Sequence, residues 1–131
     1  MIINKLGTLI LGLLLTSSIS ANQRNLEQEL GYLHDTMQPL IPLVIDDATR
    51  LVAADINETT FSRTFHIAVP QEAIEGDVFA LTMMPALVSY VCNTDNQKPL
   101  ITLGGKHRFV YLALTKEVIT DISIALEDCV N

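Results

Sequence analysis

Residues 59–69 read Thr-Thr-Phe-Ser-Arg-Thr-Phe-His-Ile-Ala-Val, a run rich in β-branched and aromatic residues that decides the fold. Side chains alternate between the two faces of a strand. One face would then carry Phe61, Arg63, Phe65, Ile67 and Val69. We therefore predict a strand over this stretch, with the phenylalanine face turned toward the core.

Three more strands are predicted around it. Residues 49–55 form the first arm of a hairpin that turns at Asn57-Glu58, because these residue types favour turns between apolar runs. Near the C-terminus, residues 107–115 and 118–128 form a second hairpin, and residues 118–128 alternate like a half-buried antiparallel strand.

A helix is predicted over residues 24–37, where apolar residues recur at helical spacing. Its stripe consists of Leu26, Leu30, Leu33 and Met37. Residues 38–42 should then run extended, because a residue that precedes proline avoids the α region.

A second helix is predicted from an Asp77 cap to Cys92, interrupted or kinked at Pro85. It is predicted to run through the apolar residues Val78, Leu81, Val88 and Cys92. A short helical turn should follow over residues 98–103 and end at Gly104-Gly105.

The expected order is therefore α-β-β-α-β-β. Two hairpins that each follow a helix predict a four-stranded antiparallel sheet whose apolar face is covered by both helices, a two-layer α+β sandwich. Since no repeat or linker divides residues 22–131, we expect a single domain there.

Residues 1–21 have the pattern of a secretory signal peptide. Lys5 supplies the positive charge, Leu6–Leu15 the apolar stretch, and the small residues up to Ala21 the cleavage site. The apolar stretch is too short to span a bilayer. Since no cysteine lies near the cleavage site, a lipid anchor is not expected. We predict export to the periplasm, with no membrane association after removal of the leader.

The chain is acidic, with 8 Lys and Arg against 15 Asp and Glu in 131 residues. Without Lys5, residues 22–131 carry a net charge of −8. Nucleic-acid affinity depends mostly on Lys and Arg that neutralise phosphates, and no basic stripe is present. The charge therefore excludes a nucleic-acid partner and favours a basic one.

Cys92 and Cys129 are the only cysteines. In an oxidising compartment such a pair most often forms a disulfide, and neither a Cys-x-x-Cys motif nor zinc-ligand spacing of histidines is present. We predict a Cys92–Cys129 bridge and neither a metal nor a cofactor.

No strong catalytic arrangement is found. Ser62, His66 and Asp55 could be assembled into a triad, but no Gly-x-Ser-x-Gly elbow supports it. His107 is interpreted as a packed or solvated side chain. The chain is thus expected to be a binding protein rather than an enzyme, and its partner should be a basic secreted protein.

Acidic residues on predicted turns are the candidate partner-binding side chains, since they can steer a basic partner. These are Glu58, Glu72, Glu75, Asp77 and Asp95.

The layout resembles the small periplasmic immunity proteins encoded beside type VI secretion effectors, in particular those that neutralise a peptidoglycan-degrading spike-protein effector. The resemblance rests on the leader Met1–Ala21, the segment Leu43–Arg50 after a proline-rich stretch, and the two cysteines. It implies inhibition of a muramidase-type effector and dimerisation.

Two other classes stay open. A periplasmic accessory or pilotin-like factor of a secretion system would have an apolar groove that takes an amphipathic helix. A small exported enzyme would bring His66, His107 and a carboxylate together in a pocket.

Overall fold

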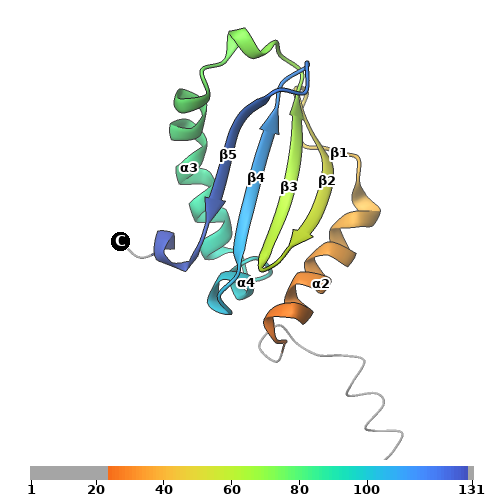
Figure 1. Cartoon of the computed structure of the whole chain (residues 1–131), viewed down its shortest axis with the longest axis vertical. Helices are drawn as coiled ribbons and strands as arrows, with labels where there is room; N and C mark the ends of the chain where they lie inside the picture. Colours follow the sequence, from red (N-terminus) through yellow and green to blue (C-terminus); the bar gives the residue numbers. More distant parts are fainter. Residues whose placement is uncertain (1–23, 130–131) are drawn as a thin grey trace, which may run out of the picture.

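In the computed structural model, which describes residues 24–129, five strands form one sheet in the order β1-β2-β3-β4-β5 (Figure 1). The strands are β1 (Leu43–Val44), β2 (Thr49–Asn57), β3 (Thr60–Ile67), β4 (Lys106–Leu112) and β5 (Val118–Ile124). The helices are α2 (Leu26–Met37), α3 (Gly76–Asn93) and α4 (Lys98–Thr102), with 3-10 turns η2 (Gln38–Leu40), η3 (Gln71–Ala73) and η4 (Leu126–Cys129). The predicted signal peptide lies outside the described residues.

The α+β class is confirmed, but the prediction of four antiparallel strands is wrong. Two-residue β1 adds a fifth strand, and β3 pairs with β4 in parallel. The reason is the connection: α3 carries the chain from the end of β3 back to its start, and such a crossover joins parallel strands. The other three strand pairs, β1–β2, β2–β3 and β4–β5, are antiparallel.

The phenylalanine face of β3 lies in the core, as predicted. Phe61, Arg63, Phe65 and Ile67 are all buried. Across the sheet, Phe65 is opposite Tyr111 of β4, and the two rings stack with their centroids 4.9 Å apart. Phe79 of α3 meets Tyr111 edge-on at 5.0 Å, which locks α3 onto this part of the sheet.

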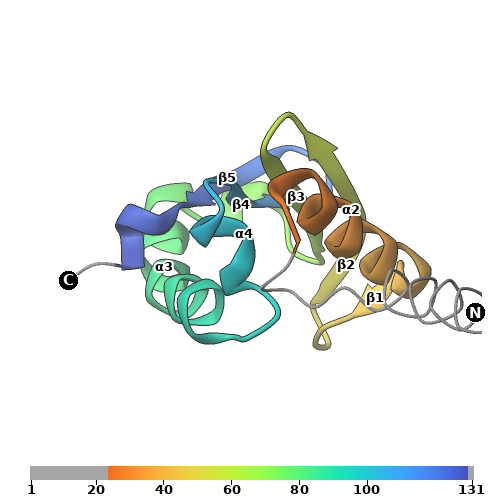
Figure 2. The ribbon, with the colours of Figure 1, turned by 90° about the horizontal axis from the view of Figure 1, so that it is seen from below.

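The core consists of two apolar clusters on one face of the sheet. Leu87 and Val91 of α3 pack in the larger cluster with the aromatic residues of β3 and β4. Leu30 and Leu33 of α2 pack in the smaller one, with Phe61 and with Leu100 of α4. Seen from below, α3 and α4 lie under β4 and β5, and α2 lies beside β2 (Figure 2).

Helix α2 agrees closely with the prediction, since its stripe residues Leu30 and Leu33 are buried. Asn25 and Gln28 form a capping box at its start. The prediction that residue 38 is extended is wrong: Gln38 keeps helical angles (φ −54°, ψ −44°) and its N–H donates to the His34 carbonyl. That hydrogen bond offsets the modest preference against helix before proline. Residues 38–40 form the 3-10 turn η2 instead of the predicted extended segment, and Ile41, before Pro42, is extended.

Helix α3 differs from the prediction in two ways. It continues through Pro85 without a break, and its N-cap is Glu75 rather than Asp77. Of the apolar residues through which it runs, Val78 and Leu81 are 55% and 76% exposed. Because the helix is apolar around most of its circumference, its periodicity does not identify the buried side.

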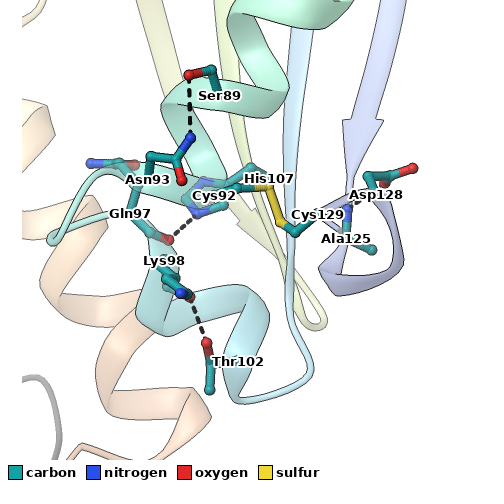
Figure 3. The surroundings of a disulfide bond; sticks show 10 residues. All are labelled: Ser89, Cys92, Asn93, Gln97, Lys98, Thr102, His107, Ala125, Asp128 and Cys129. Carbon is teal, nitrogen blue, oxygen red and sulfur yellow. Dashed lines mark hydrogen bonds between the residues drawn. A yellow bond between two sulfur atoms is a disulfide. The ribbon is translucent and has the colours of Figure 1, made fainter. Parts of the chain in front are cut away.

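The C-terminal segment ends in a turn instead of a longer strand. β5 stops at Ile124, and residues 126–129 form η4, where the Asp128 carboxylate accepts a hydrogen bond from the Ala125 N–H. The predicted disulfide is confirmed, because Cys129 of η4 bonds to Cys92 of α3 (Figure 3). The bridge therefore anchors the end of the chain to the last turn of α3.

Candidate docking groove

An apolar groove of about 680 Å³ opens between the first half of α2 and the turn that joins β2 to β3. We call it the α2–hairpin groove. It is lined by Leu26, Glu27, Leu30, Gly31, Ile56, Glu58 and Thr59. Its volume lies within the range typical of ligand sites, and its lining is predominantly apolar.

The wall formed by the β2–β3 turn is held in place by contacts with the start of β4. The Thr59 carbonyl accepts a hydrogen bond from the Lys106 N–H at 3.1 Å. A Cβ at position 105 would lie 2.8 Å from the same carbonyl oxygen, so only glycine permits this approach. Glu58 takes a left-handed conformation (φ 56°) at the tip of the turn. The turn lies one residue later than predicted, because β2 continues to Asn57.

The groove combines an apolar floor with an acidic rim. Ile56 lies on the core face of β2 opposite Phe61, yet it stays 43% exposed beside α2. Glu27 on one wall and Glu58 on the other are both exposed. No atom lies within 4 Å of a Cβ built on Gly31, so the wall is open there. Such a site suits an apolar side chain or helix face flanked by cations.

A buried polar cluster, formed by Arg63, Gln97 and His107, lies within the core. The Arg63 guanidinium donates to Gln97 Oε1 and, at 3.1 Å, to His107 Nδ1. Since arginine only donates, His107 is the neutral tautomer whose Nε2–H donates to the Gln97 carbonyl at 2.8 Å, as drawn in Figure 3. The faces of Phe61, Tyr90 and Phe109 surround the guanidinium.

Burial shifts both ionisable groups of this cluster. Desolvation lowers the pKa of Arg63 to about 10, so it stays protonated at neutral pH. Desolvation, reinforced by the Arg63 charge, lowers the pKa of His107 to about 4. The prediction that His107 is a packed or solvated side chain agrees with its full burial. The sequence placed Arg63 on the core face but gave no sign that Gln97 would meet it.

The residues considered for catalysis do not converge. Asp55 lies opposite Ser62 across the β2–β3 pair, whereas His66 is four residues further along β3, about 13 Å away at the rise of a strand. His107 is on the buried face of the sheet, away from His66 on the other face. Within residues 24–129, no group of three or more His, Cys, Asp or Glu side chains could hold a metal ion.

The five predicted partner-binding carboxylates are exposed but do not form one patch. Glu58 lines the groove. Asp95 lies in the connection between α3 and α4, at the same end of the sheet (Figure 1). Glu72, Glu75 and Asp77 lie around the start of α3, at the opposite end (Figure 1). The groove walls Leu26, Gly31 and Ile56 were not identified from the sequence, because residues 30 positions apart gave no signal of proximity.

The fold is similar to that of solved structures that include two pilotins of type II secretion systems. A Pseudomonas aeruginosa protein described as secreted matches with a TM-score of 0.69 and 11% identity, over 80% of this chain and 93% of its own. The pilotin AspS of Vibrio cholerae matches with 0.63 and 18%, over 82% and 94%. The pilotin EpsS of Vibrio vulnificus matches with 0.62 and 11%, over 81% and 96%.

At these identities the similarity establishes the fold. No family model and no curated protein matches the chain. Among the described helices, none has the length and apolar character needed to cross a bilayer.

Proposed function

We propose that this protein is an exported, pilotin-like accessory factor of a secretion system, which holds an amphipathic segment of a partner protein in the α2–hairpin groove. The shared fold with two pilotins supports the class of protein. The groove is the observation that carries the proposal, because its floor is apolar and open while both rims are acidic. The matching partner is a helix with an apolar stripe flanked by Lys or Arg.

The immunity interpretation, with a muramidase-type effector as the target, stays a prediction that neither the fold nor the groove tests. Both interpretations require a basic partner. They differ in what enters the site: an accessory factor takes a segment of a partner, whereas an inhibitor must cover the cleft of an enzyme.

A designed peptide tests the groove directly. The probe is a fluorescein-labelled amphipathic helix with a leucine stripe flanked by lysines, and the control peptide has the same composition in an order that abolishes the stripe. Fluorescence anisotropy measures the affinity of each. We expect the striped peptide to bind more tightly than the control, since only the stripe can enter the apolar floor.

Gly31 offers a matched pair of variants for this assay. Gly31→Trp should fill the open wall of the groove and weaken binding at least about tenfold. Gly31→Ala adds one methyl group in open space, so it should bind as the wild type does, while improved helix propensity raises the free energy of unfolding by about 1 kcal/mol. Equal affinity for both variants would rule out this groove.

NMR titration gives an independent check. Amide shifts should concentrate at Leu26, Gly31, Ile56 and Thr59. If the shifts lie instead around the start of α3, where Glu75 and Asp77 lie, the proposal is wrong about the site.

A further inference from the structure

The outer face of α3 is an apolar strip that no described part of the protein covers. We call it the α3 strip. It consists of the exposed residues Val78, Leu81, Thr82, Pro85, Ala86 and Ser89. Residues 78, 81, 85 and 89 follow helical spacing and so lie on one face. Leu81 is 76% exposed, more than any other large apolar side chain within residues 24–129.

The charge distribution identifies the kind of partner. From Val78 to Asn93 the sequence contains no Asp, Glu, Lys, Arg or His, whereas residues 22–131 as a whole carry a net charge of −8. A basic partner would gain no electrostatic attraction from an uncharged strip, since the acidic side chains that attract it lie elsewhere on the surface. A second copy of this chain is equally acidic, so its close approach is least opposed along a surface that carries no carboxylates, with repulsion only at the ends of that surface.

The sizes of the side chains fit a two-fold pairing. The large exposed residues Val78 and Leu81 lie in the N-terminal half of the strip, and the small residues Ala86 and Ser89 lie in the C-terminal half. An antiparallel helix pair places the large half of each copy on the small half of the other, which makes the surface self-complementary. We propose that two copies associate through the α3 strip, antiparallel, about an axis near Pro85.

Salt distinguishes this association from binding in the groove. Asp77 lies beside one end of the strip, and Asp128 lies next to Cys129, which the disulfide holds at the other end. An antiparallel pair brings these carboxylates toward each other, so screening by salt should strengthen the dimer. A basic peptide in the α2–hairpin groove should instead dissociate as salt rises. The dimer is thus independent of the proposed function.

Sedimentation velocity of the leaderless protein tests the dimer across micromolar to near-millimolar concentrations, at low and at high NaCl. We expect a monomer–dimer equilibrium that shifts toward the dimer at high salt. Leu81→Gln should raise the dissociation constant at least about tenfold, because each dimer loses two buried leucines. The control Leu114→Gln changes a side chain that is 63% exposed outside the strip and should have no effect. The proposal would be overturned if the protein stays monomeric under all conditions, or if it forms a dimer whose dissociation constant does not change with Leu81→Gln.

Cross-linking tests the antiparallel geometry. With the axis near Pro85, residue 81 of one copy faces residue 89 of the other. The double variant Leu81→Cys/Ser89→Cys should therefore form disulfide-linked dimers on a non-reducing gel. In this arrangement the two copies of residue 81 are offset by eight residues, which is about 12 Å along the helix axis. Leu81→Cys alone should therefore not cross-link. Cross-linking of the single variant would contradict the antiparallel arrangement.

Discussion

At the scale of single residues, the most informative feature is Arg63, a cation on the core face of β3 that is 2% exposed. The guanidinium is held by a side-chain amide, an imidazole nitrogen and three aromatic faces. A buried charge is costly unless hydrogen bonds replace its hydration. The arrangement therefore fixes the position of Gln97, and with it the connection between α3 and α4.

His107 makes the stability of the domain depend on pH. Its pKa falls from 6.5 to about 4 on folding, so between these values the unfolded chain binds a proton that the folded chain excludes. The contribution of neutral His107 to the free energy of unfolding is fully present above pH 6.5. As the pH falls toward 4, this free energy decreases by up to about 3 kcal/mol. Urea denaturation between pH 4.5 and 7.5 measures this slope. His107→Asn should remove most of this slope, whereas His66→Asn, on the other face of the sheet, should retain it. A slope unaffected by His107→Asn would show that other groups cause it.

At the scale of elements, the disulfide decides how the chain ends. It closes a loop with a sequence separation of 37 residues and holds η4 against the last turn of α3 (Figure 3). Cross-linking of such a loop removes conformational entropy from the unfolded chain.

Removal of the bridge should therefore lower stability without damage to the groove. We expect Cys92→Ala/Cys129→Ala to reduce the free energy of unfolding by about 3 kcal/mol, measured by chemical denaturation. The groove is lined by residues 26–31 and 56–59, outside the closed loop, and Lys106, which contacts its hairpin wall, is held in the sheet by the pairing of β4 with β3. The striped peptide should accordingly keep its affinity below the melting temperature. A large loss of peptide affinity in the folded variant would mean that the groove depends on η4.

At the scale of the whole molecule, negative charge is spread over both ends of the sheet, but only one end carries the groove. Exposed charges separated by more than a Debye length of about 8 Å at physiological salt are largely screened. Steering of a basic partner should therefore depend on the rim carboxylates rather than on the total charge.

Stopped-flow association of the striped peptide tests this locality. Glu27→Gln/Glu58→Gln should slow association roughly threefold at low salt and flatten its salt dependence. The matched variant Glu72→Ser/Glu75→Ser/Asp77→Ser removes three charges at the other end and should change the rate less, with an unchanged melting temperature. If the triple variant is the slower of the two, the partner approaches the start of α3 instead.

Much of the fold follows from the sequence because its signals are local. Alternation along residues 59–69 identified the buried face of β3, and the stripe of Leu30 and Leu33 identified the buried face of α2. The pairing of Cys92 with Cys129 followed from their number, because two cysteines allow a single intramolecular bridge. The acidic balance led us to expect a basic partner, and that expectation stays a prediction.

Only the tertiary structure decided the rest, because those features join segments that are distant in the chain. Hydropathy does not specify which neighbour a strand pairs with, so the parallel β3–β4 pair and edge strand β1 were missed. The side of α3 left exposed depends on what the sheet covers, since the helix is apolar on both sides. The α2–hairpin groove exists because Gly105 lets the hairpin approach the start of β4, a contact between residues 46 positions apart.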